Sequence, residues 1–232
     1  MELVWFGVPA LVALVVAMIR FGNGSRRRAT PFEFATRLGL QYSPTDPFGL
    51  IDHQFDLFNL ADAARCENVV WGNWHGVEVK VAELSFKPDP QGRRRQPFQG
   101  AKRFSFALVA TDAWLQDLAI RHDPLASVSE TLLLDRLRFE SDEFNRMYRV
   151  DCADERFAYK LVDARMILWL QDIGQSFPFD FQVNGNRALV WCNRLKPMGL
   201  TPLFRAAKGF VDHIPRVVLR DSALSTPDRS PD

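Results

Sequence analysis

The sequence predicts an α+β protein: an N-terminal transmembrane helix followed by one mostly antiparallel β-sheet domain with two or three packed helices. The chain opens with an uncharged apolar run from Leu3 to Ile19. Segments of strand composition then follow one another through short turns, without the regular helical crossovers that parallel strands need. Capped amphipathic segments supply the helices. A strongly bent sheet closed by the last helix, as in pleckstrin-homology-like domains, is one specific form of this architecture.

The apolar run predicts a transmembrane anchor over residues 1–22. Its length is at the short end of what crosses a hydrocarbon core of about 30 Å, and Arg20 extends it by snorkelling. A cleaved signal peptide is disfavoured because Glu2, and no basic residue, precedes the run, and because "RFGNGSRRR" is a poor cleavage site. A buried globular helix is the other alternative, but such helices rarely lack every polar residue over this length.

The arginines after the run predict the topology. Basic residues stay on the cytoplasmic side, so we expect a single-pass protein of the cell membrane with its N-terminus outside and its C-terminal domain in the cytoplasm. Residues 23–30 form a basic juxtamembrane linker. The residues expected to contact the membrane surface are Arg20, Arg26, Arg27 and Arg28. Pairing with anionic lipids would contribute about 1 kcal/mol per arginine, although a role in topology alone is the simpler interpretation.

The cytoplasmic domain, residues 31–220, is expected to begin with a short helix. Thr30 and Glu33 form a capping box, Pro31 suits the first helical position, and Gly39 ends the helix. A turn-rich link, "SPTDPFGL", and a mixed strand, "QFDLFNLA", follow.

A β-hairpin is predicted next, with strands over residues 68–71 and 77–86 and a turn over residues 72–76. The second strand alternates valines with Glu78 and Lys80, so one face is expected to be buried and the other exposed.

A basic loop is predicted between residues 87 and 103. Its glycines and prolines predict a turn-rich, mobile segment. Its basic residues form a candidate partner-binding loop: Lys87, Arg93, Arg94, Arg95, Lys102 and Arg103. Facing the bilayer, the loop would strengthen membrane contact; facing away, it would meet an acidic partner or nucleic acid. A solvated loop without a partner is the simpler interpretation.

Strands and short helical turns alternate over residues 104–150. "FSFALVAT" is predicted to be a strand, Thr111 to begin a helical turn, and "DLAIRHD" to return to strand. Ser127 and Glu130 form a second capping box ahead of "TLLLDRL". "LRFES" is predicted to be a short strand, residues 142–147 a helical turn, and "MYRV" a strand.

Two helices frame a hairpin in the C-terminal part. Asp154 is predicted to cap a helix over about 155–173, enclosed by apolar residues on two sides. "FPFDFQVNGNRALVWC" predicts a hairpin with a type I′ turn at 184–185. Thr201 starts the last helix, and residues 221–232 are predicted to be a disordered tail.

The sequence assigns no catalytic, cofactor-binding or metal-ligating residue. The four histidines lie far apart, and no nucleophile motif, phosphate loop or zinc pattern occurs. Three cysteines without a CxxC pair predict reduced thiols, which fits a cytoplasmic domain. The balance of Lys+Arg 29 against Asp+Glu 28 argues against nucleic acid as a partner.

The stretch "ESDEFNRMYRVDCADERFAYKLVDARM", residues 140–166, is dense in charge but contains no catalytic pattern. Its acids are expected to cap turns and pair with arginines. The aromatic and apolar residues expected to point inward are Phe139, Phe144, Tyr148 and Val150. Binding of a divalent cation by the acids is the less economical alternative, because their spacing does not match an EF-hand loop. We interpret the stretch as a junction that locks the sheet to the main helix.

"FATRLGLQYSPTDP", "ENVVWGNWHGVEV" and the 140–166 stretch together resemble a group of uncharacterised bacterial single-pass membrane-anchored proteins. In that group a transmembrane helix precedes a small Ala/Leu-Gly helix, an Asn-Val-Val-x-Gly hairpin and a Phe-Asn-x-x-Tyr/Phe-x-Val segment leading into a helix. The resemblance covers roughly Phe32 to Ile214, and it implies an anchor and one soluble domain. It implies no catalytic residue, because the group has no assigned activity. The Arg93–Arg95 cluster departs from the group's pattern.

The sequence therefore predicts a membrane-tethered cytoplasmic binding or scaffold domain of unknown ligand, without evident catalysis and without a cofactor. Its expected partners are the membrane, through the N-terminal span, and anionic lipids; no protein partner is identified. Two alternatives stay open. One is an anionic-lipid or headgroup-binding module that uses Arg26–Arg28 and the basic loop. The other is an enzyme with an unrecognised site, around His75 or the acids of residues 140–155.

Overall fold

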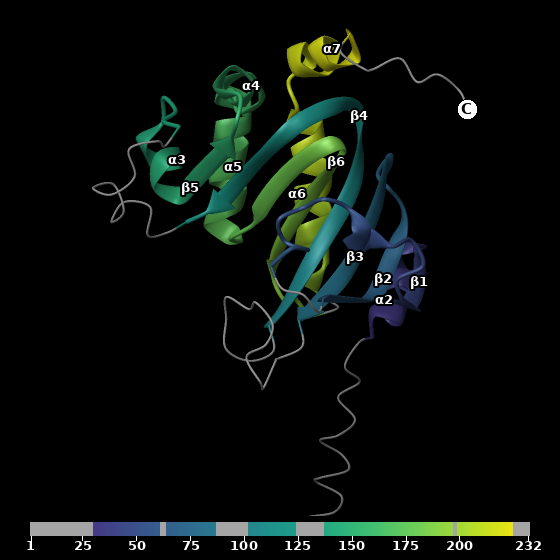
Figure 1. Ribbon diagram of the computed structural model, residues 1–232. Coiled ribbons are helices and arrows are strands. Elements are labelled where there is room, and N and C mark those ends of the chain that lie inside the picture. The colour runs from purple at the N-terminus through teal and green to yellow at the C-terminus, as the bar shows by residue number, and fades with distance from the viewer. Residues whose placement is uncertain (1–29, 61–63, 87–101, 124–136, 197–198, 225–232) are drawn as a thin grey trace, which may run out of the picture.

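The computed structural model describes residues 30–60, 64–86, 102–123, 137–196 and 199–224. These residues form one six-stranded antiparallel sheet with α-helices packed on it (Figure 1), which confirms the predicted α+β class. Six α-helices occur in this part of the chain, more than the two or three that the sequence predicted.

The elements follow one another along the chain in a mixed order of helices and strands. They are α2 (Pro31–Leu38), β1 (Gln41–Thr45), the 3-10 helix η1 (Leu50–Asp52), β2 (Ala64–Trp74), β3 (Val77–Phe86), β4 (Lys102–His122), α3 (Asp142–Met147), β5 (Tyr148–Cys152), α4 (Glu155–Leu161), α5 (Ala164–Ser176), β6 (Asp180–Asn193), α6 (Thr201–His213) and α7 (Arg216–Leu224).

The sheet is organised around β4. β6 pairs with β4 along one edge, whereas β3 and β5 occupy successive parts of the other edge. β3 pairs with residues 102–109 of β4, and β5 pairs with residues 118–122. β2 and β1 continue the sheet beyond β3. The sheet is therefore wide at one end, where β1 to β4 and β6 lie together, and narrow at the other.

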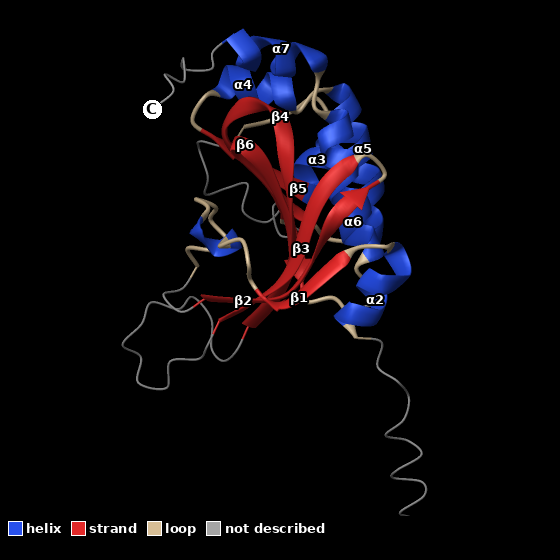
Figure 2. Ribbon diagram, turned by 90° about the vertical axis from the view of Figure 1, so that its right-hand side faces the viewer, coloured by secondary structure: helices blue, strands red, loops and turns tan. Residues whose placement is uncertain are grey.

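A bulge in the middle of β4 bends the sheet between these two ends. Where β6 advances only from Arg187 to Gly185, β4 runs from Ala110 to Leu115. The extra residues are held by a hydrogen bond of 2.9 Å from Thr111 Oγ1 to the carbonyl two residues further on. Gly185 faces the bulge with φ +60°, a left-handed conformation that glycine adopts without steric cost. β4 and β6 are thus strongly curved at the end where α4 and α7 lie (Figure 2).

This bend corrects two sequence predictions. The helical turn predicted from Thr111 is a bulge within one continuous strand, β4. The hairpin predicted at 184–185 is the facing bend within one continuous strand, β6. Both local signals mark a real change in chain direction. The chain does not reverse there because β4 and β6 pair with each other on both sides of the bend, and this long-range pairing overrides the turn preference.

The sheet separates two hydrophobic cores. On one face lie α2, α5 and α6 (Figure 2), and the rings of Phe34 in α2 and Phe204 in α6 have centroids 6.0 Å apart. On the other face, the segment around η1 packs Phe58 against Phe106 of β4. The sheet is bent, as in the pleckstrin-homology-like option, but three helices rather than the last helix alone cover its face.

The first helix and the first hairpin follow their local signals. α2 has the predicted capping box between Thr30 and Glu33, and it ends at Gly39 with φ +67°. The β2–β3 hairpin is present with longer strands and a tighter turn at His75 and Gly76.

Two predicted strands, over residues 54–61 and 137–141, are absent among the residues that the structure describes. Tertiary packing holds both segments in other conformations. Residues 54–60 form turns rather than a strand, and Phe55 and Phe58 both reach the second core. A strand would place residues three apart on opposite faces. Residues 137–141 have no regular secondary structure.

The long helix predicted after Asp154 is broken into two. α4 ends at Leu161, and Asp163 then caps α5 by accepting a hydrogen bond from Met166 N at 2.9 Å. The second cap satisfies an N–H group that a new helix start would otherwise leave without a partner.

Part of the sequence prediction concerns residues outside the described ranges. These are the anchor at 1–22, the linker up to residue 29, residues 87–101 of the basic loop, the capping box at Ser127 and Glu130, and residues 225–232 of the tail. Within the ranges that are described, no helix is both long enough and apolar enough to cross a membrane. α7 extends to Leu224, into the segment assigned to the tail.

Candidate binding cavities

The 140–166 stretch forms the junction that its inward-pointing residues predicted. The rings of Phe144 and Tyr148 stack with centroids 5.4 Å apart, and both residues are buried together with Phe139 and Val150. The Tyr148 hydroxyl donates to the carbonyl of Leu170 in α5 at 3.1 Å. These contacts attach α3 and β5 to α5, the helix that lies against the sheet.

The same stretch lines a cavity of about 680 Å³ between α4, α5 and the irregular segment before α3. We call it the apolar cavity. Its lining consists of Arg138, Phe139, Glu140, Ser141, Tyr159, Val162, Asp163, Ala164, Ile167, Leu168 and Gln171. Leu168 is 69% exposed and Tyr159 is 46% exposed, so apolar surface faces solvent at the cavity. Its volume lies within the range of about 300–1,000 Å³ that ligand pockets usually have.

Polar contacts hold the wall of the apolar cavity in place. The Tyr159 hydroxyl donates to the carbonyl of Arg138 at 3.2 Å, and Gln171 Nε2 donates to Ser141 Oγ at 3.0 Å. Asn145 exchanges two hydrogen bonds, of 3.0 and 2.8 Å, with the main chain of the same segment. The wall is therefore attached to α3, α4 and α5, although it has no regular secondary structure.

A second cavity, of about 400 Å³, lies on another side of α4, next to α7 and the bend of β4. We call it the polar cavity. Its lining consists of Trp114, Gln116, Asp154, Arg156, Phe157, Lys160, Val218, Asp221 and Ser222. Acidic and basic side chains balance in this set. The polar cavity therefore combines hydrogen-bonding groups of both signs with an aromatic ring and apolar side chains.

Trp114 projects from the bulge of β4 and is 51% exposed. Its ring lies against Gly185: a Cβ at that glycine would be 3.4, 3.5 and 3.6 Å from Cζ2, Cη2 and Cε2. Because three ring atoms are almost equidistant from this point, one face of the indole covers the glycine. Since the side chain is nevertheless about half exposed, the opposite face is the one available to solvent.

Asp154 organises the polar groups of this cavity. Its Oδ1 caps α4 by accepting from the main-chain N–H of Arg156 at 2.9 Å and of Phe157 at 3.2 Å, and its Oδ2 accepts from Gln116 Nε2 at 3.4 Å. The hydrogen bond from the Phe157 N–H lowers the pKa of Asp154, which is therefore ionised at neutral pH.

Lys160 and Asp221 connect α4 to α7 across the same cavity. Lys160 Nζ lies 2.8 Å from Asp221 Oδ2, and this hydrogen-bonded ion pair lowers the pKa of Asp221. Both side chains are about half exposed, so the pair contributes little to stability.

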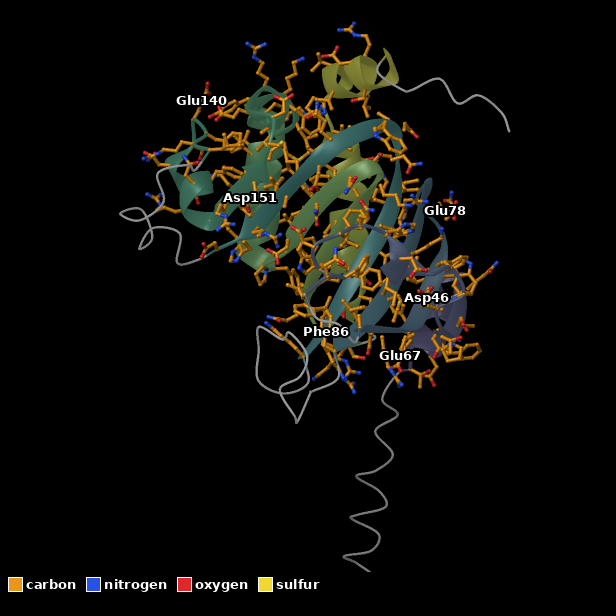
Figure 3. All side chains as sticks on the ribbon, viewed as in Figure 1. Asp46, Glu67, Glu78, Phe86, Glu140 and Asp151 are labelled. Atoms are coloured by element: carbon orange, nitrogen blue, oxygen red, sulfur yellow. The ribbon has the colours of Figure 1, made fainter. Side chains whose placement is uncertain are left out.

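The described residues of the predicted partner-binding loop lie at the other end of the domain. Of its basic residues, Lys102 and Arg103 are described, and both are exposed at the start of β4. Phe86 at the end of β3 and the start of α2 lie at the same end, whereas α4 and α7 lie at the opposite end (Figures 1 and 3). The predicted site residues outside the described ranges are Arg20, Arg26, Arg27, Arg28, Lys87, Arg93, Arg94 and Arg95.

Packing accounts for two of the cysteines and two of the histidines, to which the sequence assigned no role. Burial raises the pKa of the Cys66 thiol, and it raises the pKa of Cys192 to about 12, so neither forms a reactive thiolate near neutral pH. His75 stands edge-on to the preceding tryptophan in the β2–β3 turn, and His213 stacks on Trp169. Among the residues with described positions, no group of three or more His, Cys, Asp or Glu could hold a metal ion.

Sequence reasoning missed both cavities, because it treated the helix after Asp154 as continuous and enclosed. If the helix were continuous, Tyr159 and Leu168 would lie on two different apolar sides of it, and both sides were expected to be buried. The break at Asp163 instead leaves both residues exposed at the apolar cavity. A signal was available: an aspartate followed by a helical apolar pattern is a usual N-cap.

No protein-family model and no curated protein matches the chain. Among solved structures, the crystal structure of the mycobacterial trehalose monomycolate transport factor A, TtfA, has a similar fold. The TM-score is 0.53 at 14% sequence identity, and the match covers 81% of this chain and 92% of that one. At this level of identity the likeness concerns the fold alone.

Proposed function

We propose that the protein is a membrane-tethered binding or scaffold domain, without catalysis, that serves the transport or handling of a lipid. The apolar cavity carries this proposal. Leu168 and Tyr159 keep apolar surface in contact with water beside a preformed hollow, which is unfavourable unless a partner covers it. An apolar side chain of a partner protein would fill the hollow and remove this surface from water.

The position of the apolar cavity favours a scaffold over a headgroup-binding module. α2 begins directly after the predicted linker, so an anchor in the bilayer would bring the end with Lys102 and Arg103 toward the membrane surface. The apolar cavity, at the opposite end, would then face away from the lipid and toward other proteins. The resemblance to single-pass membrane-anchored proteins supports the same arrangement.

The fold likeness supports the lipid connection. TtfA is a trehalose monomycolate transport factor, and its fold is matched over 92% of its chain. From this likeness we propose for the present protein only an accessory role in lipid handling at a membrane. The proposal also places the domain on the cytoplasmic side of the membrane. This placement depends on the arginines after the apolar run.

Site-specific photo-crosslinking in the native membrane tests the proposal on the full chain. A photoreactive amino acid replaces Leu168 in one variant and Val217 in the matched control, since Val217 is an exposed apolar residue on α7 outside both cavity linings. We expect a discrete protein adduct at position 168 and none at 217. Equal adducts at both positions, or none at 168, would contradict the scaffold. A lipid adduct at 168 would contradict the scaffold and show that the apolar cavity itself contacts lipid.

A further inference from the structure

We propose that the polar cavity binds a neutral carbohydrate of about one or two sugar rings, with Trp114 as its stacking platform. This inference goes beyond the proposed function, because it concerns a different cavity and a different class of ligand. It rests on the open face of Trp114, on the hydrogen-bonding groups around that face, and on the balance of charge in the lining.

The open indole face matches the apolar side of a sugar ring. A pyranose presents C–H groups on one face and hydroxyl groups around its edge, so an aromatic ring covers the first while polar side chains bind the second. Trp114 is suited to this because its other face rests on Gly185 and its position is fixed by the bulge of β4. Phe157 and Val218 extend the apolar part of the cavity.

The polar groups provide both acceptors and a planar donor. Ionised Asp154 only accepts hydrogen bonds, and among the described residues its Oδ2 has one long contact, from Gln116 at 3.4 Å. Arg156 offers a guanidinium fork whose parallel N–H groups suit adjacent hydroxyl oxygens. Within the described residues this guanidinium makes no hydrogen bond and no ion pair. A carboxylate, an amide and a guanidinium beside one aromatic ring can together donate to and accept from vicinal hydroxyls.

The charge balance selects a neutral ligand. Asp154 and Asp221 carry as much negative charge as Arg156 and Lys160 carry positive charge, and Lys160 is already paired with Asp221. The two carboxylates offset the attraction that the two cations exert on a phosphate or carboxylate, whereas uncharged hydroxyl groups bind to both signs. The volume of about 400 Å³ is at the small end for ligand pockets and therefore favours a short saccharide.

A free saccharide and the sugar headgroup of a glycolipid share this chemistry, and two experimental arms distinguish them. In both arms the full chain is embedded in phosphatidylcholine nanodiscs, which avoids detergents with sugar headgroups. The first arm titrates neutral mono- and disaccharides by saturation-transfer NMR and by tryptophan fluorescence. The second arm measures binding to phosphatidylcholine vesicles that contain a neutral glycolipid, against vesicles of phosphatidylcholine alone. We expect saturable binding in at least one arm.

Matched variants locate the binding. Trp114→Ala is expected to weaken binding about tenfold or more, which corresponds to about 1.4 kcal/mol. Gln116→Met keeps about the length of this exposed side chain but removes its amide, and it is expected to weaken binding several-fold. Phe48→Ala removes an exposed aromatic ring elsewhere and is expected to bind as the wild type does. Thermal unfolding verifies that each variant is folded.

Three results would overturn the proposal. They are the absence of saturable binding in both arms, an equal loss in Phe48→Ala and Trp114→Ala, and tighter binding of a sugar phosphate than of the neutral sugar. Binding in the first arm identifies a free saccharide as a sufficient ligand. Binding in the second arm alone identifies a glycolipid headgroup.

Discussion

The contact between β5 and α5 predicts that Gly174→Ala destabilises the domain, although alanine is the better helix former. Gly174 lies in α5 opposite the buried Tyr148. A Cβ at this position would lie 2.8 Å from Met147 Cε and 3.1 Å from Tyr148 Cζ, and it would overlap Tyr148 Oη. Tyr148 cannot withdraw easily, because it is buried and its hydroxyl is bonded to Leu170 O.

The magnitude follows from three opposing contributions. Replacing glycine by alanine inside a helix stabilises it by about 1 kcal/mol. Overpacking a close-packed core costs about 1–3 kcal/mol. Displacing the Tyr148 hydroxyl from its acceptor costs about 0.5–1.5 kcal/mol more. We therefore expect a net loss of about 0.5–3.5 kcal/mol in the free energy of unfolding.

Urea unfolding of residues 30–232 measures this loss. Gly199→Ala is the matched control, because nothing lies within 4 Å of a Cβ at Gly199, and it should leave the unfolding midpoint unchanged. Adding Tyr148→Phe removes the atom that the new methyl group overlaps, so the double variant should lose less stability than the sum of the single variants. An unchanged or higher stability of Gly174→Ala would refute the packing described at this junction.

Three further predictions concern groups away from this contact. Burial raises the pKa of Asp180 to about 6, above the value of about 3.9 for an exposed aspartate, so its ionisation makes stability fall as pH rises between about 4 and 6. Asp180→Asn should therefore gain up to about 3 kcal/mol relative to the wild type across this window in urea unfolding. Asp163→Ala should cost about 1 kcal/mol of unfolding free energy, because the α5 cap is lost. Cys66 and Cys192 should resist alkylation at pH 8 in the native state and react once urea unfolds the chain, as mass spectrometry would show.

Each of these expectations has a contrary result. His122, whose pKa is lowered by burial, destabilises the fold as pH falls, so only the difference between Asp180→Asn and the wild type isolates the carboxyl. A difference that is constant with pH would contradict a raised pKa at Asp180. No loss in Asp163→Ala would mean that the cap is dispensable. Rapid native alkylation of Cys66 or Cys192 would show that these thiols are not buried.

Local chemistry was enough to predict the elements that depend on few long-range contacts. The capping box at Thr30 and the glycine after α2 fix that helix almost alone. The alternating residues of β3 fix the orientation of the first hairpin. The inward residues of the 140–166 stretch were also predictable, because aromatic side chains at these spacings have few alternatives to the core.

The bend and the cavities could not be predicted in the same way, because they depend on pairing between distant segments. Thr111 and Gly185 each carry a turn signal, and only the pairing of β4 with β6 turns both signals into one bulge. Each cavity likewise needs walls from several elements: the polar cavity combines β4, α4 and α7. Exposure of Leu168 follows from a helix break whose effect depends on what packs around it.

The orientation of the domain at the membrane is the property on which the proposed function depends most. It can be measured on the full chain in bilayers that contain anionic lipid and a headgroup-attached fluorescence quencher. One fluorophore is placed through Arg103→Cys and another through Leu168→Cys, each with the half-buried Cys152 changed to serine. We expect strong quenching at position 103 and little at 168. Stronger quenching at 168 than at 103 would contradict a domain that holds its apolar cavity away from the membrane.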